Sequence, residues 1–472
     1  YYWRSPDGGW AFASEIKQFT TLPGWQAEAN IERVHDFLAG GTSLDESSFF
    51  RGVRRLPGGH SLILDVASGD LQTRSWYDIE TISPAPLPDG PTAAAEHFHA
   101  LLEDSVRLRL RADVKIGSGL SGGLDSSSIV CCASRLLGAA DRQDQQAVVT
   151  SCSPHAEYDE QDYAGEVVRA TQATWHKIFT DYDGLTEKFS DLVWHHDEPF
   201  GSSSGYAQWS IFECARANGI TVMLDGQGAD EYLAGYPEFF PALFQERMQQ
   251  RHFRQLLEEI QEFRLQQSLS TSELGRRLLS TFLPAGLRRH LRVIAGRDRC
   301  NWLRSEQATL PIFRASVRDS SLALLKSTRL PNLLQLADRN SMAHSVETRV
   351  PFLDHRLVEF ALALPAEWKI RHGQTKRLLR DAMRNDVPGK VIERKDKMGL
   401  PTAEAIWLRN DAPRVEKILA EIGARLPKLI HEAKLQKQFR NDAKGGKLAI
   451  GSGYWRLLCL GQWLDRFEVH IQ

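Results

Sequence analysis

Residues 120–127 read LSGGLDSS, and this stretch decides the fold of the chain. It follows a short apolar strand expected at 114–116 and opens a helix expected at about 127–137. Two adjacent glycines, Gly122 and Gly123, permit a sharp turn in which several backbone N–H groups point at one anion. The N-terminus of the helix adds partial positive charge. The stretch therefore predicts a phosphate-binding loop between a strand and a helix.

The side chains of this loop narrow the choice of ligand. Ser121, Ser126 and Ser127 supply hydroxyl groups. Asp125 would repel a bare phosphate, but it suits a site in which Mg²⁺ lies between the carboxylate and the phosphates. The loop has no Gly-Lys-[Ser/Thr] ending and is not a Walker A loop. A dinucleotide-binding pattern, GxGxxG at 117–122, is disfavoured because the next strand ends in TSCS, without an acid for the ribose.

Strands and helices alternate after this loop. We expect strands at 147–150 and 220–224, and helices at 160–171 and 205–218. Such alternation favours a parallel sheet covered by helices on both faces. From about residue 237 onward, the pattern indicates one helix after another. The predicted class is α/β with a helical C-terminal part.

The N-terminal stretch is expected to be rich in β-strands instead of alternating strands and helices. A strand is expected at 10–13, and a hairpin from strands at 60–66 and 71–77. Closely spaced prolines follow, and they indicate a stiff linker because proline does not suit a helix interior or a central strand. Thr92 is then expected to cap a helix at 93–110. The predicted units are residues 1–82, a linker at 83–92, and residues 93–472.

Composition excludes several classes of protein. The 472 residues are 42% hydrophobic and 25% charged, with a net charge of −2, so no electrostatic argument favours nucleic acid. The apolar runs are too short for a transmembrane helix, and no membrane partner is expected. Six cysteines without a CxxC pattern favour free thiols in a reducing, cytoplasmic compartment. The chain does not open with Met, and we expect it to be a fragment or a processed product.

The SGGLDSS stretch resembles the pyrophosphate loop of the N-type ATP pyrophosphatases, or PP-loop enzymes. With a β-rich unit before it, the chain resembles the class B, glutamine-dependent asparagine synthetase family. Four further stretches match that family's pattern in order: DGQGADE at 225–231, LPNLL to VPFLD at 330–354, KRLLR at 376–380 and RKDKMGLP at 394–401.

The resemblance implies a fold in two parts. Residues 1–82 would be the C-terminal remnant of a type 2 glutamine amidotransferase domain, an Ntn-type αββα sandwich. Residues 93–472 would form a PP-loop ATP pyrophosphatase domain, similar to the adenine nucleotide alpha hydrolases. The family's glutaminase domain begins with a nucleophilic cysteine, and no cysteine precedes Cys131 here. As it stands, the chain is expected not to hydrolyse glutamine.

The resemblance also implies an activity. The family adenylates the aspartate side chain with ATP and Mg²⁺ and transfers ammonia from glutamine, giving asparagine, AMP and pyrophosphate. Asp125 and Asp230 would share the Mg²⁺. A lysine would neutralise phosphate charge in the transition state, and we favour Lys397 over Lys395 because KMGLP resembles the bacterial motif. The implied nucleotide-binding residues are Leu120, Ser121, Gly122, Gly123, Asp125, Ser126, Ser127, Asp225 and Gly226.

One departure from the pattern concerns the acceptor. Members that form asparagine usually have Glu where this chain has Gln227, close to the acyl-adenylate and the incoming amine. Gln keeps its hydrogen-bonding capacity but cannot take a proton as a carboxylate does. A second hypothesis is therefore a ligase that acts on a peptide or natural-product carboxylate, as lasso-peptide cyclases and β-lactam synthetases do. The expected partners are small-molecule substrates, and the resemblance leaves room for a homodimer.

Overall fold

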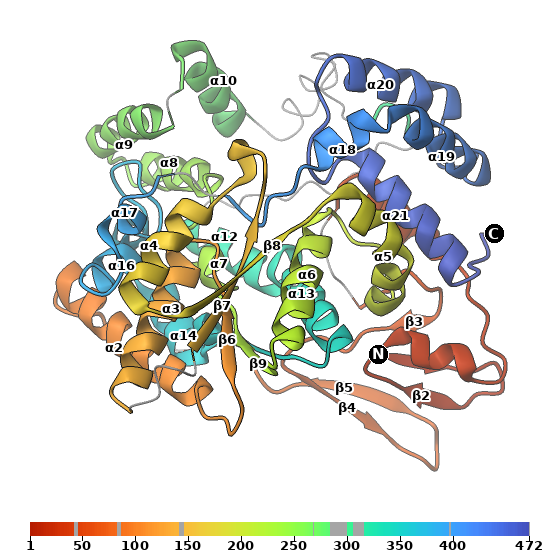
Figure 1. Ribbon diagram of the computed structural model, residues 1–472, viewed down its shortest axis with the longest axis horizontal. Helices are drawn as coiled ribbons and strands as arrows, with labels where there is room; N and C mark the ends of the chain where they lie inside the picture. The colour runs from red at the N-terminus through yellow and green to blue at the C-terminus, as the bar shows by residue number, and fades with distance from the viewer. Residues whose placement is uncertain are drawn as a thin grey trace.

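The computed structural model describes residues 1–41, 46–82, 86–140, 146–267, 269–283, 300–304, 316–395 and 398–471. A five-stranded sheet lies at its centre, in the order β10-β9-β6-β7-β8, and every neighbouring pair is parallel (Figure 1). The strands are β6 (Ile116–Gly119), β7 (Gln146–Cys152), β8 (Thr174–Phe179), β9 (Val222–Leu224) and β10 (Glu347–Arg349). The predicted α/β class with a parallel sheet is confirmed.

Both faces of this sheet are buried, because successive side chains of a strand point to opposite sides. Val148 of β7 packs into one hydrophobic cluster, while its neighbours Ala147 and Val149 pack into another. Met223 of β9 belongs to the second cluster, whereas Leu224 belongs to the first. Strands buried on both faces explain the nearly continuous apolar runs in the sequence.

Helices cover the two faces. One side carries α2 (Pro91–Arg109), α3 (Leu124–Gly138) and α4 (Gln161–Thr171), and the other carries α6 (Ser204–Ala217) and α13 (Leu330–Ala343). The expected cap Thr92 is wrong by two residues. Gly90 is the N-cap of α2, and Pro91 takes the first helical position, where its fixed φ suits a helix.

Further helices surround the ends of the sheet. They are α7 (Ala229–Tyr232), α8 (Phe239–Gln249), α9 (Phe253–Gln266), α10 (Thr271–Phe282), α12 (Val317–Ala323), α14 (His355–Ala363), α15 (Ala366–Lys369), α16 (Arg377–Ala382) and α17 (Gly389–Ile392). Short helical turns lie at η1 (Ile16–Thr21), η3 (Ala156–Tyr158), η4 (Leu324–Thr328) and η5 (Pro351–Leu353). In the part of the chain that the structure describes, no helix is both long and apolar enough to cross a bilayer.

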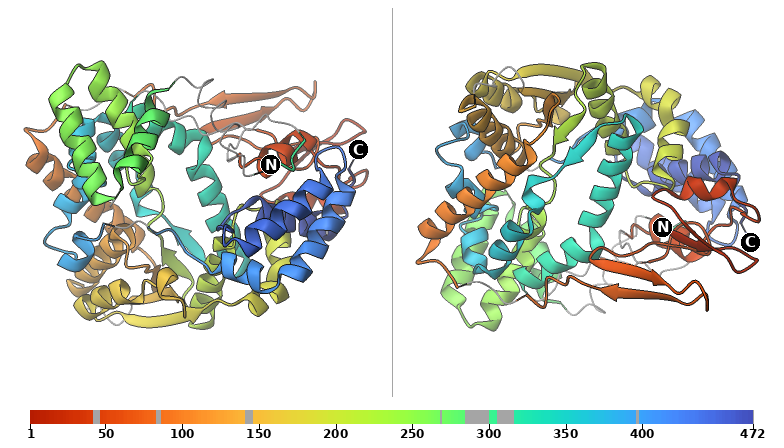
Figure 2. Two further views of the ribbon diagram at one scale, coloured as in Figure 1. Left: turned by 90° about the horizontal axis from the view of Figure 1, so that it is seen from above. Right: turned by 90° about the horizontal axis from the view of Figure 1, so that it is seen from below.

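A layer of helices lies beside the sheet, most of it from the C-terminal part of the chain (Figure 1, blue, with α5 in yellow). It comprises α5 (Tyr182–His196), α18 (Glu404–Asn410), α19 (Ala412–Arg425), α20 (Glu432–Lys444) and α21 (Gly453–Arg466). Figure 2 shows the first residues of the chain packed against this layer. The rings of Phe50 and Trp463 approach to 5.0 Å between centroids, so both ends of the chain share one core.

The N-terminal unit contains two small sheets. β1 (Tyr2–Arg4), β2 (Trp10–Phe12) and β3 (Val53–Arg54) form an antiparallel sheet in the order β2-β1-β3. β4 (His60–Leu64) and β5 (Leu71–Ser75) form the expected hairpin, and α1 (Ile31–Leu38) precedes β3 in the chain. Residues 83–85 of the expected linker lie outside the described residues. The domain boundaries stay a prediction.

Candidate active site

The phosphate loop lies where β6 ends and α3 begins, as the sequence predicts. Leu120 extends the sheet by one more hydrogen bond, donating its backbone N–H to the carbonyl of Val149 at 3.0 Å. Ser121 and Ser126 then hold the turn, with their hydroxyl oxygens 3.1 Å apart. Ser126 Oγ also accepts the backbone N–H of Ser121 at 3.3 Å and donates to the carbonyl of Gly123 at 3.2 Å. The loop therefore holds its own shape.

At position 122 of this loop, any residue other than glycine would strain the backbone. The φ of Gly122 is +69°, in the left-handed region that favours glycine. A Cβ there would lie 2.5 Å from the backbone nitrogen of Ala164, on α4. Because Gly122 has no side chain, the loop lies directly against α4. The N-terminus of α3 then lies at the carboxyl edge of the sheet.

A second loop, residues 225–231, follows β9, the immediate neighbour of β6. The two loops touch each other. A Cβ on Gly226 would lie 3.1 Å from the backbone nitrogen of Ser126. Gly228 has a φ of +99°, and a Cβ there would meet the side chain of Leu353. Loops after neighbouring parallel strands meet at the carboxyl edge of a sheet, which is where α/β proteins bind ligands.

Asp125 and Asp230 meet at one lysine. Lys376 Nζ lies 2.5 Å from Asp125 Oδ2 and 2.5 Å from Asp230 Oδ1, and all three residues are buried. The two carboxylate oxygens are therefore separated by no more than twice that distance. The two predicted metal ligands, which are 105 positions apart in the chain, face one point in space.

Sequence reasoning did not assign Lys376 to the site. It lies just before α16, in a left-handed conformation with a φ of +54°. Gly235 makes room for it, because a Cβ at that position would collide with Asp230 and with Cε of Lys376. The sequence did contain a signal for it: the KRLLR stretch at 376–380 matches the family's pattern, and Lys376 is the only lysine in that stretch.

Two arginines beside the phosphate loop, Arg380 and Arg394, line the same cleft and support the loop. Arg394 pairs with Glu160 at 2.6 Å and donates to the carbonyl of Gly122 at 3.3 Å, and both charged side chains are buried. Arg380 in turn donates to the carbonyl of Arg394 at 2.9 Å. Burial lowers the pKa of Arg380, although the nearby Asp125 carboxylate opposes this change. These contacts tie residues 380–394 to the loop.

Burial also changes the acids of the second loop. It raises the pKa of Asp225 to about 6, although the backbone N–H groups of Gln227 and Gly226 stabilise the carboxylate. The pKa of Glu231 is raised by burial and by the charge of Asp230, and Tyr236 donates a hydrogen bond to it at 2.6 Å. This loop thus holds two acids whose pKa values are raised, and perturbed pKa values are common at functional sites.

The two loops line a cleft with a volume of about 480 Å³. Of the residues predicted to bind the nucleotide, Gly122 and Ser127 lie behind the cleft, where Ser127 is fully buried. The others line it: Leu120, Ser121, Gly123, Asp125, Ser126, Asp225 and Gly226. Gln227, Asp230 and Lys395 line it as well. Lys397, the predicted transition-state lysine, lies outside the described residues.

The donor set of this site suits Mg²⁺ bound together with phosphates. Mg²⁺ prefers oxygen ligands and is usually held by one or two carboxylates and the phosphates of a substrate. Asp125 and Asp230 supply two such carboxylates around a point that one ammonium group now fills. Among the described residues no group of three or more His, Cys, Asp or Glu could hold a metal ion on its own. A bound cation would therefore need ligands from the substrate.

Comparisons with known proteins agree with this geometry. The family described as asparagine synthase matches residues 97–465, and the glutamine amidotransferase domain family matches residues 1–77. An NMN synthetase from Francisella tularensis overlaps 32% of this chain and 60% of its own, with 16% identity and a TM-score of 0.21, and no argument rests on it.

Curated relatives match most of the chain. A Mycobacterium tuberculosis protein, provisionally named a glutamine-hydrolysing asparagine synthetase, is 28% identical and covers 85% of this chain and 63% of its own. The glutamine-hydrolysing asparagine synthetase 1 of Bacillus subtilis is 27% identical, with the same coverage. Amidase chyE of Penicillium rubens is 28% identical and covers 84% of this chain and 65% of its own. The chain thus spans less than two thirds of the length of these relatives.

Proposed function

The chain belongs to the asparagine synthase family, and from that premise we propose that it is an ATP-dependent ligase that turns a carboxylate into an amide. One observation carries the proposal: two buried carboxylates, from loops after neighbouring parallel strands, face one lysine beside a phosphate loop. The arrangement suits a reaction that divides ATP between its α and β phosphates, because charge accumulates on pyrophosphate at that point.

The proposed reaction has two steps. The acceptor carboxylate first attacks the α-phosphate of ATP, which releases pyrophosphate and leaves an acyl-adenylate. The backbone N–H groups of the loop, with Ser121 and Ser126, would hold the departing phosphates, and Mg²⁺ bound by Asp125 and Asp230 would offset their charge. Ammonia then attacks the activated carbonyl carbon, and AMP leaves. Lys376 would move from the carboxylates toward the phosphates as the nucleotide binds.

The acceptor we propose is the aspartate side chain, with asparagine as the product. The support is the name that two of the relatives carry and the family match over residues 97–465. In the longer protein, glutamine would supply the ammonia, since residues 1–77 match the glutamine amidotransferase domain family. Lys397 would neutralise phosphate charge, and Gln227 would contact the acyl group.

Release of pyrophosphate tests this proposal directly. The purified chain is given ATP, Mg²⁺, ammonium chloride and aspartate, and pyrophosphate, AMP and asparagine are measured. All three products should appear together, and Asp125→Asn should abolish them while its circular dichroism stays that of the wild type. Aspartate-dependent ADP instead of AMP would contradict the proposal, because ADP reports attack at the γ-phosphate.

A second candidate acceptor is a peptide or natural-product carboxylate. Two observations favour it: Gln227 lines the cleft where family members that form asparagine usually have Glu, and one relative is named an amidase. The same assay distinguishes the two acceptors. Pyrophosphate release that ignores aspartate but responds to a larger carboxylate would favour the second. Gln227→Glu should then shift the preference toward aspartate.

A further inference from the structure

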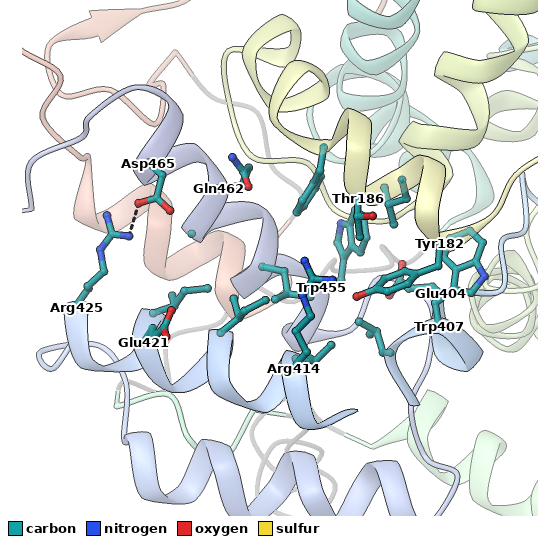
Figure 3. Close-up of a pocket in the computed structure, with 18 residues that line it drawn as sticks. Tyr182, Thr186, Glu404, Trp407, Arg414, Glu421, Arg425, Trp455, Gln462 and Asp465 are labelled. Carbon is teal, nitrogen blue, oxygen red and sulfur yellow. Dashed lines mark hydrogen bonds and ion pairs between the residues drawn. The ribbon is translucent and has the colours of Figure 1, made fainter. Parts of the chain in front are cut away.

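A second cavity lies in the C-terminal helical layer, and its volume is about 210 Å³. Its walls come from α5, α18, α19 and α21. Figure 3 shows Tyr182 between Trp455 and Trp407, while the Arg414 side chain rises from the helix below them. Most of the remaining wall is apolar and includes Leu185, Phe189, Ile418 and Leu458. A concave apolar wall with a few polar groups is typical of a small-molecule site.

The acidic side chains at this cavity all have partners. Asp465 pairs with Arg425 at 2.6 Å, at the far end of the cavity (Figure 3). Glu404 accepts hydrogen bonds from the backbone N–H groups of Ser203 and Gly451, at 3.0 and 2.9 Å. Glu421 lies on the exposed side of α19 and reaches Lys417 at 4.0 Å. None of these three acids forms an ion pair with Arg414, the cation at the mouth of the cavity.

Arg414 is the cation at the mouth of the cavity, and 63% of its side chain is exposed. Its side chain extends from α19 toward Trp455 and Tyr182 (Figure 3). It reaches Asp411 only at 3.8 Å, and Asp411 already accepts a hydrogen bond from the Tyr182 hydroxyl at 2.9 Å. A guanidinium group offers five N–H donors in a planar fork that matches a carboxylate. The cavity therefore combines flat apolar walls with an anion-binding group at its mouth.

We propose that this cavity binds a small organic monocarboxylate with an aromatic or branched aliphatic body. The carboxylate pairs with Arg414, and the body lies among Trp407, Trp455 and Leu458. A cavity of about 150 Å³ holds benzene, so the larger space here accommodates up to a bicyclic ring. Nothing in this inference requires the proposed ligase activity.

One layer of residues separates this cavity from the candidate active site. Glu404 lines the cavity and accepts a hydrogen bond from the Ser203 hydroxyl at 2.8 Å, and that hydroxyl also lies 2.5 Å from Thr402 Oγ1. The residues on either side of Ser203, Ser202 and Ser204, line the nucleotide cleft. A ligand that packs against α18 therefore lies one hydrogen bond from the wall of the cleft, and through Glu404 the monocarboxylate alters nucleotide affinity.

Direct binding of 2-naphthoate tests the site. Titration calorimetry with the purified chain should give one saturable site, and the neutral 2-naphthamide should bind about tenfold more weakly, because a charge-assisted hydrogen bond is lost. Arg414→Gln should weaken naphthoate binding about fivefold, because an ion pair at the mouth of the cavity is partly screened by solvent. The matched control Arg425→Gln, whose guanidinium pairs with Asp465, should leave binding within about twofold. Equal binding to Arg414→Gln and wild type, or no saturable binding, would overturn the site.

Filling the cavity gives a second test that keeps Arg414. Ile418→Trp places a large side chain in the apolar wall, and it should abolish naphthoate binding while the thermal unfolding transition remains cooperative. Unchanged binding to this variant would show that naphthoate binds elsewhere and would overturn the proposal.

The regulatory part is tested by nucleotide binding rather than by turnover, so it is independent of the proposed reaction. The dissociation constant of Mg·ATP should change about fivefold when the cavity is saturated with naphthoate. By linkage, ATP should change the affinity for naphthoate by the same factor. Glu404→Gln should reduce this coupling without preventing naphthoate binding. Identical ATP affinities with and without naphthoate would overturn the regulatory role.

Discussion

The two loops that form the candidate site hold their shapes in different ways. The first loop, 120–127, is stabilised by its own hydroxyl groups and by the helix that it opens. The second loop, 225–231, depends on contacts with other segments, namely the first loop and Leu353. The first loop therefore has local hydrogen bonds of its own in addition to its contacts with Arg394 and α4, whereas the second relies mainly on contacts with other segments. Variants that alter one loop and spare the other should separate the two kinds of stability.

The largest expected effect is on catalysis, through the first loop. Asp125→Asn removes one carboxylate and leaves Lys376 paired with Asp230. We expect the rate of pyrophosphate release to fall about 10³-fold, which is the usual effect of removing one preorganised charge-stabilising group from an enzyme active site. Initial rates measure this, with Asp183→Asn on α5 as the control, which should keep the wild-type rate. A decrease of less than tenfold for Asp125→Asn would mean that this loop does not bind the reacting phosphates.

The next effect concerns the lysine that joins the two loops. Lys376→Met leaves two buried carboxylates facing each other, and we expect a loss of about 3 kcal/mol in the free energy of unfolding, measured with urea. Lys369→Met is the matched control, because Lys369 is also buried but donates to the carbonyl of Ala361 at 3.0 Å. It should cost about 1 kcal/mol.

Adding Mg²⁺ should distinguish the Lys376→Met variant from the Lys369→Met variant. Millimolar Mg²⁺ should restore part of the stability of Lys376→Met, because the ion can lie between the carboxylates in place of the ammonium group. It should not restore Lys369→Met. If neither variant responds, Asp125 and Asp230 do not form a cation site without the nucleotide.

A smaller effect is expected from the backbone of the first loop. Gly122→Ala forces a Cβ into α4 at a positive φ, and it should cost about 2 kcal/mol of unfolding free energy. Gly119→Ala is the control from the same loop region, since a Cβ there would meet nothing within 4 Å. It should remain within about 1 kcal/mol of the wild type. Chemical unfolding of both variants decides whether Gly122 is needed for its shape.

The smallest effect is a pH dependence in the second loop. The pKa of Asp225 is about 6 in the folded state, above its ordinary value of 3.8. The stability that this group contributes is therefore fully present below about pH 4 and is lost as the pH rises through 6. Relative to wild type, Asp225→Asn should gain roughly 1 kcal/mol between pH 4.5 and 7.5, since the half-buried carboxylate is partly solvated. Unfolding at several pH values would show a flat difference if the carboxylate ionises normally.

The sequence predicted the first loop because the features that define it lie within a dozen residues, although Arg394 and α4 also support it. A strand, two glycines and a helix start follow one another, so local rules were sufficient. β8 was not expected, since Trp175, Ile178 and Phe179 neither alternate with polar residues nor form a continuous run. Lys376 was missed for a different reason. Only the folded chain brings it to Asp125, and no local pattern reports such a contact.

That separation along the chain has a consequence for how the protein is made. Asp125 and Lys376 are 251 positions apart. A ribosome that adds about 5 to 20 residues per second would produce Lys376 roughly 10 to 50 s after Asp125. During translation the first loop can therefore fold on its strand and helix well before its lysine partner exists. The charge arrangement is complete only after residue 376 has been added, so until then a nascent chain presents Asp125 without this counter-ion.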